Sequence, residues 1–540
     1  MARKPLEEKG VHRAKLWEIG FYALNNTSTN AYMMLVGSIS YFLVGIVGIG
    51  AVLAGSIVTI MRIWDGVTDP FIGMIVDNTN TKFGKNRPFI VLGQIVLFSM
   101  TFVMFRVIPS IPQGGRFVAF IIIYMVYIVG YTFQCVVTKS AQTCLTNDPE
   151  QRPIFTMFDA TYNVLLMSVF WPVFLSSTLL PKFTVTSAAA ADKLNALLAQ
   201  NPTLTNVVVT GEDGVQTLSG FYNPEMWQYM QLVVGAIAAV FACCAIVGLS
   251  RKDNVKYFGT GKVERISFKD YADVLAHNRG IQMLVVAASS DKLAMSCTSA
   301  AAVTMALYGI IFGNYALNGS VSAITGVPIC IIGIFLIGSI ARKMGQKTCL
   351  VVGTWGSIIS AVALGVMICF AHGGNISWPT FSLTNFATYG NLFKASNWTF
   401  LGVLYMLLYI VMKSFSQMSG NIVIPMTADC ADYEVYRSRR YVPGLMGTLF
   451  SFVDKLISSL AATFVAIFYS WIGYKSTLPT ETDPYTSGVL IITLLCFLGM
   501  PMVGWILNVV AMKFYPLTKE KMAEIQDEIA QIKAEAMAKK

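Results

Sequence analysis

Long apolar runs recur about a dozen times along the chain, separated by shorter polar segments. Each run has roughly 20 residues or more, which lets a helix cross a hydrocarbon core of about 30 Å. The sequence lacks the strict alternation over about 10 residues that marks the strands of a transmembrane β-barrel. The pattern therefore predicts an all-α polytopic membrane protein with twelve transmembrane helices. The predicted spans are 16–43, 48–76, 88–108, 117–145, 151–181, 225–250, 281–313, 319–341, 348–371, 399–431, 443–472 and 485–513.

Composition and charge support this class. Of the 540 residues, 55% are hydrophobic and 13% are charged, whereas about a quarter are charged in a soluble domain. The formal net charge of +10 comes from cations that gather in alternate loops, which is the positive-inside pattern and not a nucleic-acid surface. We therefore expect a multi-pass protein of the cell (plasma or inner) membrane with both termini in the cytoplasm. The cation-rich segments are 1–15, 82–87, 251–280, 342–347, 437–440 and the tail after 513.

A long basic connection divides the predicted helices into two sets of six. Each set carries a similar loop after its second helix, GMIVDNTNTKFGKNRP (73–88) and GSIARKMGQK (338–347). A glycine such as Gly73 or Gly338 lets two helices approach closely, and the pairing favours a six-plus-six duplication. The alternative is that the two loops are similar by chance, because any basic cytoplasmic loop that follows a glycine would have this pattern. The expected divisions are a cytoplasmic N-terminus 1–15, a six-helix bundle 16–250 with an external insertion 182–224, a cytoplasmic central loop 251–280, a second bundle 281–513 and a cytoplasmic tail 514–540.

The remaining segments add little chemistry. The N-terminus is too charged for a cleaved signal peptide. The tail spaces Met522, Ile525, Ile529 and Ile532 as on one helix face, which predicts an amphipathic helix that is solvated or lies on the membrane surface. The ten cysteines lack a CxxC pair, and we interpret them as small apolar residues. No nucleophile with a partnered base and no nucleotide loop is present, so we do not expect an enzyme.

Three charges interrupt the second predicted helix. Asp65 and Asp69 are four residues apart, so both carboxylates project from one face about 5–6 Å apart and repel unless a cation lies between them. Arg62 lies one turn earlier and offers one explanation, a self-compensated charge cluster. The other is a site for Na⁺ or H⁺, since hard cations take oxygen ligands.

Other charges fall within predicted helices of both halves. We expect Lys455 to face the interior as a movable countercharge to the aspartates. For Lys292 and Lys413, an ion pair or a snorkelling side chain is at least as good an interpretation as a functional role. The remaining charges within predicted helices are Lys139, Asp159, Asp291 and Asp454.

Three motifs carry a resemblance to a known family. WDGVTDPFIGMIVDNTNTKFGKNRP (64–88), ADCADYEVYRSRR (428–440) and FVDKLISSLA (452–461) resemble segments of the glycoside–pentoside–hexuronide:cation symporters, typified by the melibiose permease, in the major facilitator superfamily. The resemblance covers nearly the whole chain and implies the major facilitator fold.

The resemblance also implies a cation site between helices II and IV. It assigns Asp65 and Asp69 to the two cation-site aspartates, which are the candidate Na⁺ ligands. Thr68 stands where the permease has an asparagine, and Thr132 falls on a threonine of helix IV. Arg62 and Lys455, with the neighbouring Asp454, match the family's charge network.

The family's sugar site is less well reproduced. Helix I reads ALNNTSTNAY (23–32) without an acid, and the acidic position of helix IV corresponds to Cys135. The nearby aromatic position aligns with Lys139. A cationic Lys139 beside a helix I rich in amides and hydroxyls would suit a sugar that bears a carboxylate, such as a hexuronide. The candidate substrate residues are Asn26, Thr29, Asn30, Cys135, Lys139 and Asp159.

Taken together, these patterns predict a secondary active sugar or glycoside symporter that works by alternating access as a monomer. Its coupling ion would be Na⁺ or H⁺, with no other cofactor. Two alternatives remain open. A lipid or lysolipid transporter on the same scaffold would need an apolar cavity that extends to the membrane. A non-transporting sensor would need a sizeable soluble domain, whereas the tail has only about 27 residues.

Overall fold

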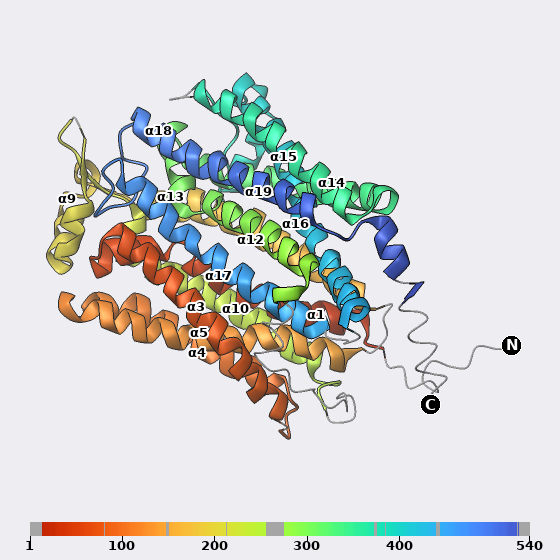
Figure 1. Cartoon of the computed structure of the whole chain (residues 1–540). Helices are drawn as coiled ribbons and strands as arrows, with labels where there is room; N and C mark the ends of the chain where they lie inside the picture. The colour runs from red at the N-terminus through yellow and green to blue at the C-terminus, as the bar shows by residue number, and fades with distance from the viewer. Residues whose placement is uncertain are drawn as a thin grey trace.

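The computed structural model describes residues 13–79, 81–146, 151–211, 213–254, 275–371, 375–383, 385–438, 443–525 and 527–528. Long helices run side by side through the molecule (Figure 1). The helical elements of the first half are α1 Leu16–Val36, α2 Ile39–Phe42, η2 Leu43–Val47, α3 Ala51–Asn78, α4 Arg87–Arg106, η3 Ile108–Ser110, α5 Gln113–Leu145, α6 Arg152–Val164, η4 Leu165–Phe170, α7 Trp171–Val173, η5 Phe174–Leu179, α8 Leu180–Phe183 and α10 Pro224–Leu249.

The second half has the same kind of architecture. Its elements are α12 Arg279–Thr298, α13 Ala301–Thr304, η9 Met305–Ile311, α14 Ala316–Met344, α15 Gln346–Cys369, η10 Phe386–Phe393, η11 Ala395–Asn397, α16 Phe400–Ser438, α17 Pro443–Ser470, α18 Ser487–Leu494, η12 Leu495–Gly499 and α19 Met500–Phe514. A further helical segment occupies 519–525.

The predicted helical membrane protein is confirmed, whereas the predicted twelve spans are not all found among the described residues. Within the described residues, ten helices are long and apolar enough to cross a membrane. The pair Arg279–Thr298 and Ala301–Ile311, bent by 49°, makes an eleventh if it is one span. The described apolar part of α17, Lys455–Ser470, is shorter than a span. The exact count of twelve therefore remains a prediction.

The first helix of each half ends in the same way. In both, an α-helix breaks, resumes for one turn and finishes in a π-helix, at η2 in the first half and η9 in the second. A glycine with positive φ follows each, Gly48 at 80° and Gly313 at 77°. The loops after the second helices match as well, since Gly84 and Gly345 have φ values of 101° and 87°. These paired features support the predicted duplication.

The expected close helix approach at Gly73 is absent from this structure. A Cβ atom added there would meet nothing within 4 Å. The close approach on α3 occurs instead at Gly55, where an added Cβ would lie 2.6 Å from the carbonyl oxygen of Ala462 on α17. Nearby, the Thr59 hydroxyl donates to the carbonyl of Ser459 over 2.7 Å. The two halves therefore meet at the start of α3.

The insertion 182–224 folds into a small unit of its own. Strands β1 Val185–Thr186, β2 Val209–Thr210 and β3 Gln216–Leu218 form an antiparallel sheet in the order β1-β3-β2. Helix α9 Ser187–Gln200 and the turns η6 Pro202–Val207 and η7 Gly220–Tyr222 complete it. Figure 1 shows α9 beyond one end of the long helices, which we call the insertion end. The opposite end, where α1 begins and α19 finishes, is the terminal end.

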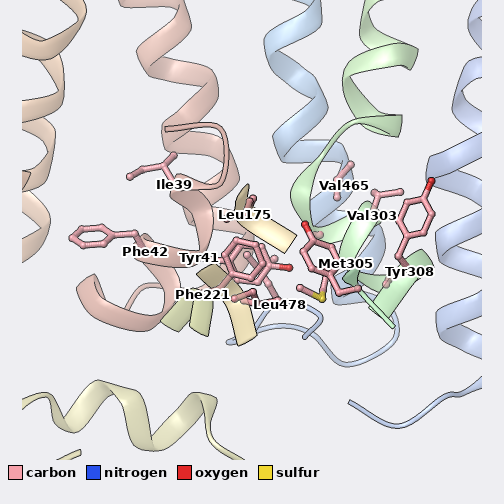
Figure 2. Packing of buried hydrophobic residues seen from close by; sticks show 14 of the residues in the cluster. Ile39, Tyr41, Phe42, Leu175, Phe221, Val303, Met305, Tyr308, Val465 and Leu478 are labelled. Atoms are coloured by element: carbon pink, nitrogen blue, oxygen red, sulfur yellow. The ribbon is translucent and has the colours of Figure 1, made fainter. Parts of the chain in front are cut away.

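The two halves share a core at one end only. The largest cluster of buried apolar residues combines both halves, and a close view of it includes Tyr41 and Phe221 beside Leu478 (Figure 2). A second cluster, with Ile281 and Ile525, belongs to the second half alone, and a third, with Ile19, to the first half alone. Among the described residues, the halves are thus packed together at the insertion end and have separate cores towards the terminal end.

The described start of the tail is not a free surface helix. Ile525 is fully buried, and Met522 packs against the same second-half cluster. Lys519 donates to the carbonyl of Lys343 over 3.1 Å. The prediction of a solvated or membrane-surface tail is therefore wrong for these residues, because their apolar face finds a partner on the protein. Ile529 and Ile532 lie outside the described residues.

Candidate functional site

A charge cluster joins α3 to α17 across the two halves. Asp65 is buried, with 2% of its side chain exposed. Lys455 Nζ lies 3.3 Å from Asp65 Oδ2 and 2.6 Å from Asp69 Oδ2. The i, i+4 spacing on α3 therefore places both carboxylates at one ammonium group, as expected for a countercharge.

Hydroxyl groups complete one side of this cluster. Thr132 on α5 donates to Asp65 Oδ1 over 3.2 Å. Thr68 donates to the backbone carbonyl of Asp65 over 3.0 Å, and its Oγ1 lies 3.4 Å from that of Thr132. The oxygens of Asp65, Asp69, Thr68 and Thr132 are the hard ligands that a small monovalent cation prefers. They are the atoms that would hold a coupling ion.

Arg62 lies at the edge of the cluster. Its guanidinium is 3.9 Å from Asp65 Oδ2, a longer contact than that of Lys455. A cavity of only about 20 Å³ lies beside Arg62 and Asp65, with Tyr124, Tyr127 and Tyr131 in its wall. The self-compensated cluster predicted as an alternative is therefore incomplete, because the shorter ion pairs come from Lys455 in the other half.

The candidate substrate residues on α1, the predicted helix I, form a polar network with α6. Asn26 donates to Asp159 Oδ1 over 2.7 Å, and Asn30 donates to Asn163 Oδ1 over 2.6 Å. Asn163 in turn donates to the same Asp159 oxygen over 3.0 Å. Thr29 is buried and donates to the carbonyl of Asn25 in its own helix. The structure thus groups Asn26, Asn30 and Asp159, while the Thr29 hydroxyl is engaged elsewhere.

Of the remaining candidate residues on α5 and α17, the structure describes the side chain of one, Cys135. Cys135 is half-buried on α5, close enough to interact electrostatically with Asp65, Asp69 and Lys455. It therefore lies nearer the charge cluster than the helix I network. Lys139 and Asp454 lie on α5 and α17, but their side chains are outside the part of the structure that is described.

A large cavity lies mainly among second-half helices. It has a volume of about 580 Å³, within the range of ligand pockets. Two cations, Lys292 and Lys413, and one acid, Asp291, line it. The acid accepts a hydrogen bond of 2.8 Å from Trp505 Nε1. No ion pair joins Lys292 or Lys413 to another described residue at salt-bridge distance, and the described lining holds two cations against one acid.

The predicted substrate residues whose side chains are described, which leaves Lys139 aside, do not line this cavity. Its polar wall comes largely from α16, where lining residues recur with helical spacing: Tyr409, Lys413, Ser416, Gln417, Gly420 and Asn421. Ser168 on η4 and Ser322 and Thr325 on α14 add hydroxyls. The periodic polar stripe of α16 was visible in the sequence. The resemblance to the permease predicts the sugar site in the first half instead.

A family model described as MFS/sugar transport protein matches residues 20–519. The chain is 29% identical over 132 residues to the glucuronide carrier protein homolog of Escherichia coli (strain K12), which covers 24% of this chain and 29% of that protein. It is 24% identical over 315 residues to the lactose permease of Leuconostoc lactis, covering 55% of this chain and 43% of the permease. These alignments span less than half the length of either curated relative.

Solved structures of transporters have the same fold. The nucleoside transporter NupG matches with a TM-score of 0.57 at 9% identity, covering 93% of this chain and all of that one. A bacterial homolog of the human lysosomal transporter Spinster, inward-facing and unoccupied, matches with a TM-score of 0.55 at 13% identity, covering 97% and 99%. At these identities the similarity shows the fold alone.

Proposed function

The chain belongs to the family of MFS/sugar transport proteins, and from this premise we propose that it is a secondary active symporter for a glycoside and a monovalent cation, Na⁺ or H⁺. The observation that carries the proposal is the bridge from Lys455 to both Asp65 and Asp69. This bridge links the two halves that must move relative to each other in alternating access. The protein would reside in the cell membrane with both termini in the cytoplasm.

The charge cluster suggests how cation and movement are coupled. Two carboxylates on one helix face repel each other unless a positive charge compensates them. Lys455 supplies that charge in the structure, and a cation bound by Asp65, Asp69 and the threonine hydroxyls would replace it. Binding of the cation would free Lys455 and loosen the contact between α3 and α17. The cation would then favour one arrangement of the halves over the other.

The large cavity favours a sugar that bears a carboxylate. Lys413 and Lys292 offer ammonium groups, while hydroxyl and amide groups of α14 and α16 suit a sugar ring. A relative named as a glucuronide carrier protein homolog is consistent with such a substrate. The anionic group would thus meet the second half, whereas the sequence pointed to Lys139 in the first half.

The same cavity argues against the lipid or lysolipid alternative. An acyl chain needs an apolar path to the membrane, whereas Asp291 and two lysines lie in the wall of this cavity beside apolar residues such as Met167 and Ile329. Competition by lysolipids for transport, without competition by sugars, would favour the alternative over the sugar symporter.

Uptake into proteoliposomes tests the proposed function. A labelled glucuronide and a panel of neutral glycosides are offered while Na⁺ and proton gradients are imposed separately. We expect one gradient to drive accumulation, and Asp65→Asn or Asp69→Asn to abolish the stimulation. Asp192→Asn, an exposed aspartate on α9, is the matched control. Stimulation that persists in both Asp65→Asn and Asp69→Asn would reject the assigned site.

A further inference from the structure

Side chains of the insertion bind the loop between α17 and α18, residues 471–486. Ser219 donates to both carboxylate oxygens of Glu481, over 3.0 and 2.8 Å. The Thr184 hydroxyl shares its proton between Glu481 Oε1, at 3.0 Å, and the carbonyl of Leu180, at 2.9 Å. A carboxylate of the second half is therefore held by two hydroxyl groups of the first half. None of these residues belongs to the charge cluster or the large cavity.

Two tyrosine hydroxyls hold the backbone of the same loop. Tyr222 donates to the Leu478 carbonyl over 3.1 Å and accepts from the Leu478 N–H over 2.9 Å. Tyr41 donates to the Pro479 carbonyl over 2.6 Å. Backbone groups of the loop, which water would otherwise satisfy, are thus paired with side chains from the opposite half.

Aromatic rings back these hydrogen bonds. The rings of Tyr41 and Phe221 stack with centroids 4.5 Å apart, and Leu478 is buried beside them (Figure 2). Phe221 also packs edge-on against Tyr315 of the second half at 6.1 Å. Apolar burial and directional hydrogen bonds therefore act together at one junction.

This junction lies where the halves are closed. The contacts of Gly55 with α17 and of Gly319 with η5 and α7 lie at the same end, whereas the cores towards the terminal end are separate. A cycle that exposes the cavity on the insertion side must break all of these contacts. We propose that the insertion 182–224 is a latch that holds the insertion end closed through Ser219 and Thr184 on Glu481, and that its release precedes opening on that side.

The chemistry of Glu481 suits a reversible contact. Two neutral hydroxyls hold this half-buried carboxylate. Among the described residues, no Lys or Arg lies at ion-pair distance from it. Hydrogen bonds to a charged group are strong, yet water replaces hydroxyl donors well once the carboxylate is exposed. The latch is therefore firm when closed and has an open state that solvent stabilises. The inference rests on the proposed transport cycle, although its test needs neither substrate nor coupling ion.

The native Cys330 reports on opening because it lines the large cavity. A membrane-impermeant maleimide is added on the insertion side of oriented vesicles, and modification of Cys330 is followed by peptide mass spectrometry. We expect the double variant Ser219→Ala/Thr184→Val and the single variant Glu481→Ala to increase the labelling rate about tenfold. Thr205→Ala is the matched control, since this exposed hydroxyl of the insertion donates to the carbonyl of Pro202 and, among the described residues, makes no hydrogen bond to the second half.

Glu481→Gln keeps the shape of the side chain and one acceptor oxygen, so it should restore most of the slow labelling. Labelling rates equal to the parent in both the double variant and Glu481→Ala would overturn the latch, as would an equal increase in Thr205→Ala. Faster labelling without gradient-driven sugar uptake would leave the latch standing and reject the symporter. Gradient-driven sugar uptake with unchanged labelling rates would support the symporter and reject the latch.

Discussion

At the scale of single residues, the contacts of Lys455 imply that a coupling cation would have to displace this lysine from two carboxylates. The same ammonium lies within 3.3 Å of oxygens from Asp65 and Asp69. A cation cannot take both carboxylates while Lys455 stays between them. The lysine thus links the halves, and in the proposed symporter it would compete with the cation.

Replacing Lys455 by Gln removes this competitor and leaves two uncompensated carboxylates. We expect the cation to bind about tenfold or more tightly, because an opposite charge near a partly buried pair is worth one or more kcal/mol. Release of the cation should become slower, and turnover should fall with it. Equilibrium binding of Na⁺ and the rate of uptake measure the two effects. An unchanged cation affinity would show that Lys455 does not compete for the site.

Lys413 should select the charge of the substrate. Lys413→Gln removes one ammonium from the cavity, and a charge-assisted hydrogen bond contributes about 1.5–3 kcal/mol. We expect KM for a glucuronide to rise about tenfold or more, with little change for a neutral glycoside. Lys193→Gln, which removes an exposed lysine paired with Glu225, serves as the control. Equal effects on both kinds of sugar would count against a carboxylate contact.

Residue-level prediction succeeded where the pattern was local. The i, i+4 spacing of Asp65 and Asp69 sets their common face, and only the fold brings Lys455 to them, from 386 residues beyond Asp69. The sequence offered Lys455 as a countercharge by its sign and helix, not by any spacing. The sequence does not decide the roles of Lys292 and Lys413, because the packing of the helices determines which face of α12 and α16 is interior.

At the scale of elements, a buried aspartate fixes the loop before α4. Asp253 accepts hydrogen bonds from the backbone N–H groups of Lys85, Asn86 and Arg87, between 2.9 and 3.2 Å. These are donors that the start of a helix leaves unpaired. Gly84 lets the chain turn here with a φ of 101°.

Gly84→Ala should destabilise this junction. A Cβ would lie 2.5 Å from the Asp253 carbonyl oxygen, and the left-handed backbone adds about 1–2 kcal/mol for a residue other than glycine. We expect the melting temperature of the purified protein to fall by several degrees. Gly345→Ala should cause a smaller fall, because its Cβ would meet only the Lys519 side chain, at 3.1 Å. The opposite order would contradict this account of the loop.

The latch should also respond to pH on the insertion side. Partial burial raises the pKa of Glu481, although the hydroxyls of Ser219 and Thr184 lower it in part. The pKa should return towards its ordinary value when the carboxyl meets water in the open state. Closing therefore takes up protons, so acid favours the closed state, and this stabilisation is lost as pH rises through the raised pKa. The titratable groups that face Glu481 are Asp483, Tyr41, Tyr222 and Tyr315.

Labelling of Cys330 measures this response if each rate is divided by that of Glu481→Gln at the same pH, which cancels the pH dependence of the thiol. The ratio should fall as the medium is acidified from about pH 8 to pH 5. A constant ratio would show that Glu481 does not titrate during closing.

At the scale of the whole molecule, helix positions were predictable and helix shapes were not. The predicted spans coincide closely with the helices, because membrane thickness fixes the length of an apolar run. The π-turns η2, η4, η5, η9 and η12 leave no hydrophobic signature. The sheet of the insertion was also missed, since its strands have only two or three residues. Separate cores towards one end and a shared core at the other follow from how the halves dock.

The central claim is that cation and sugar sites are coupled through the cluster of Asp65, Asp69 and Lys455. Calorimetric titration of the purified protein measures it most directly, with sugar binding determined with and without the cation, and cation binding with and without the sugar. Linkage requires each ligand to tighten the other by the same factor. We predict a factor of about ten or more, reduced to one in Asp69→Asn. Independent binding of the two ligands to the parent protein would contradict the account.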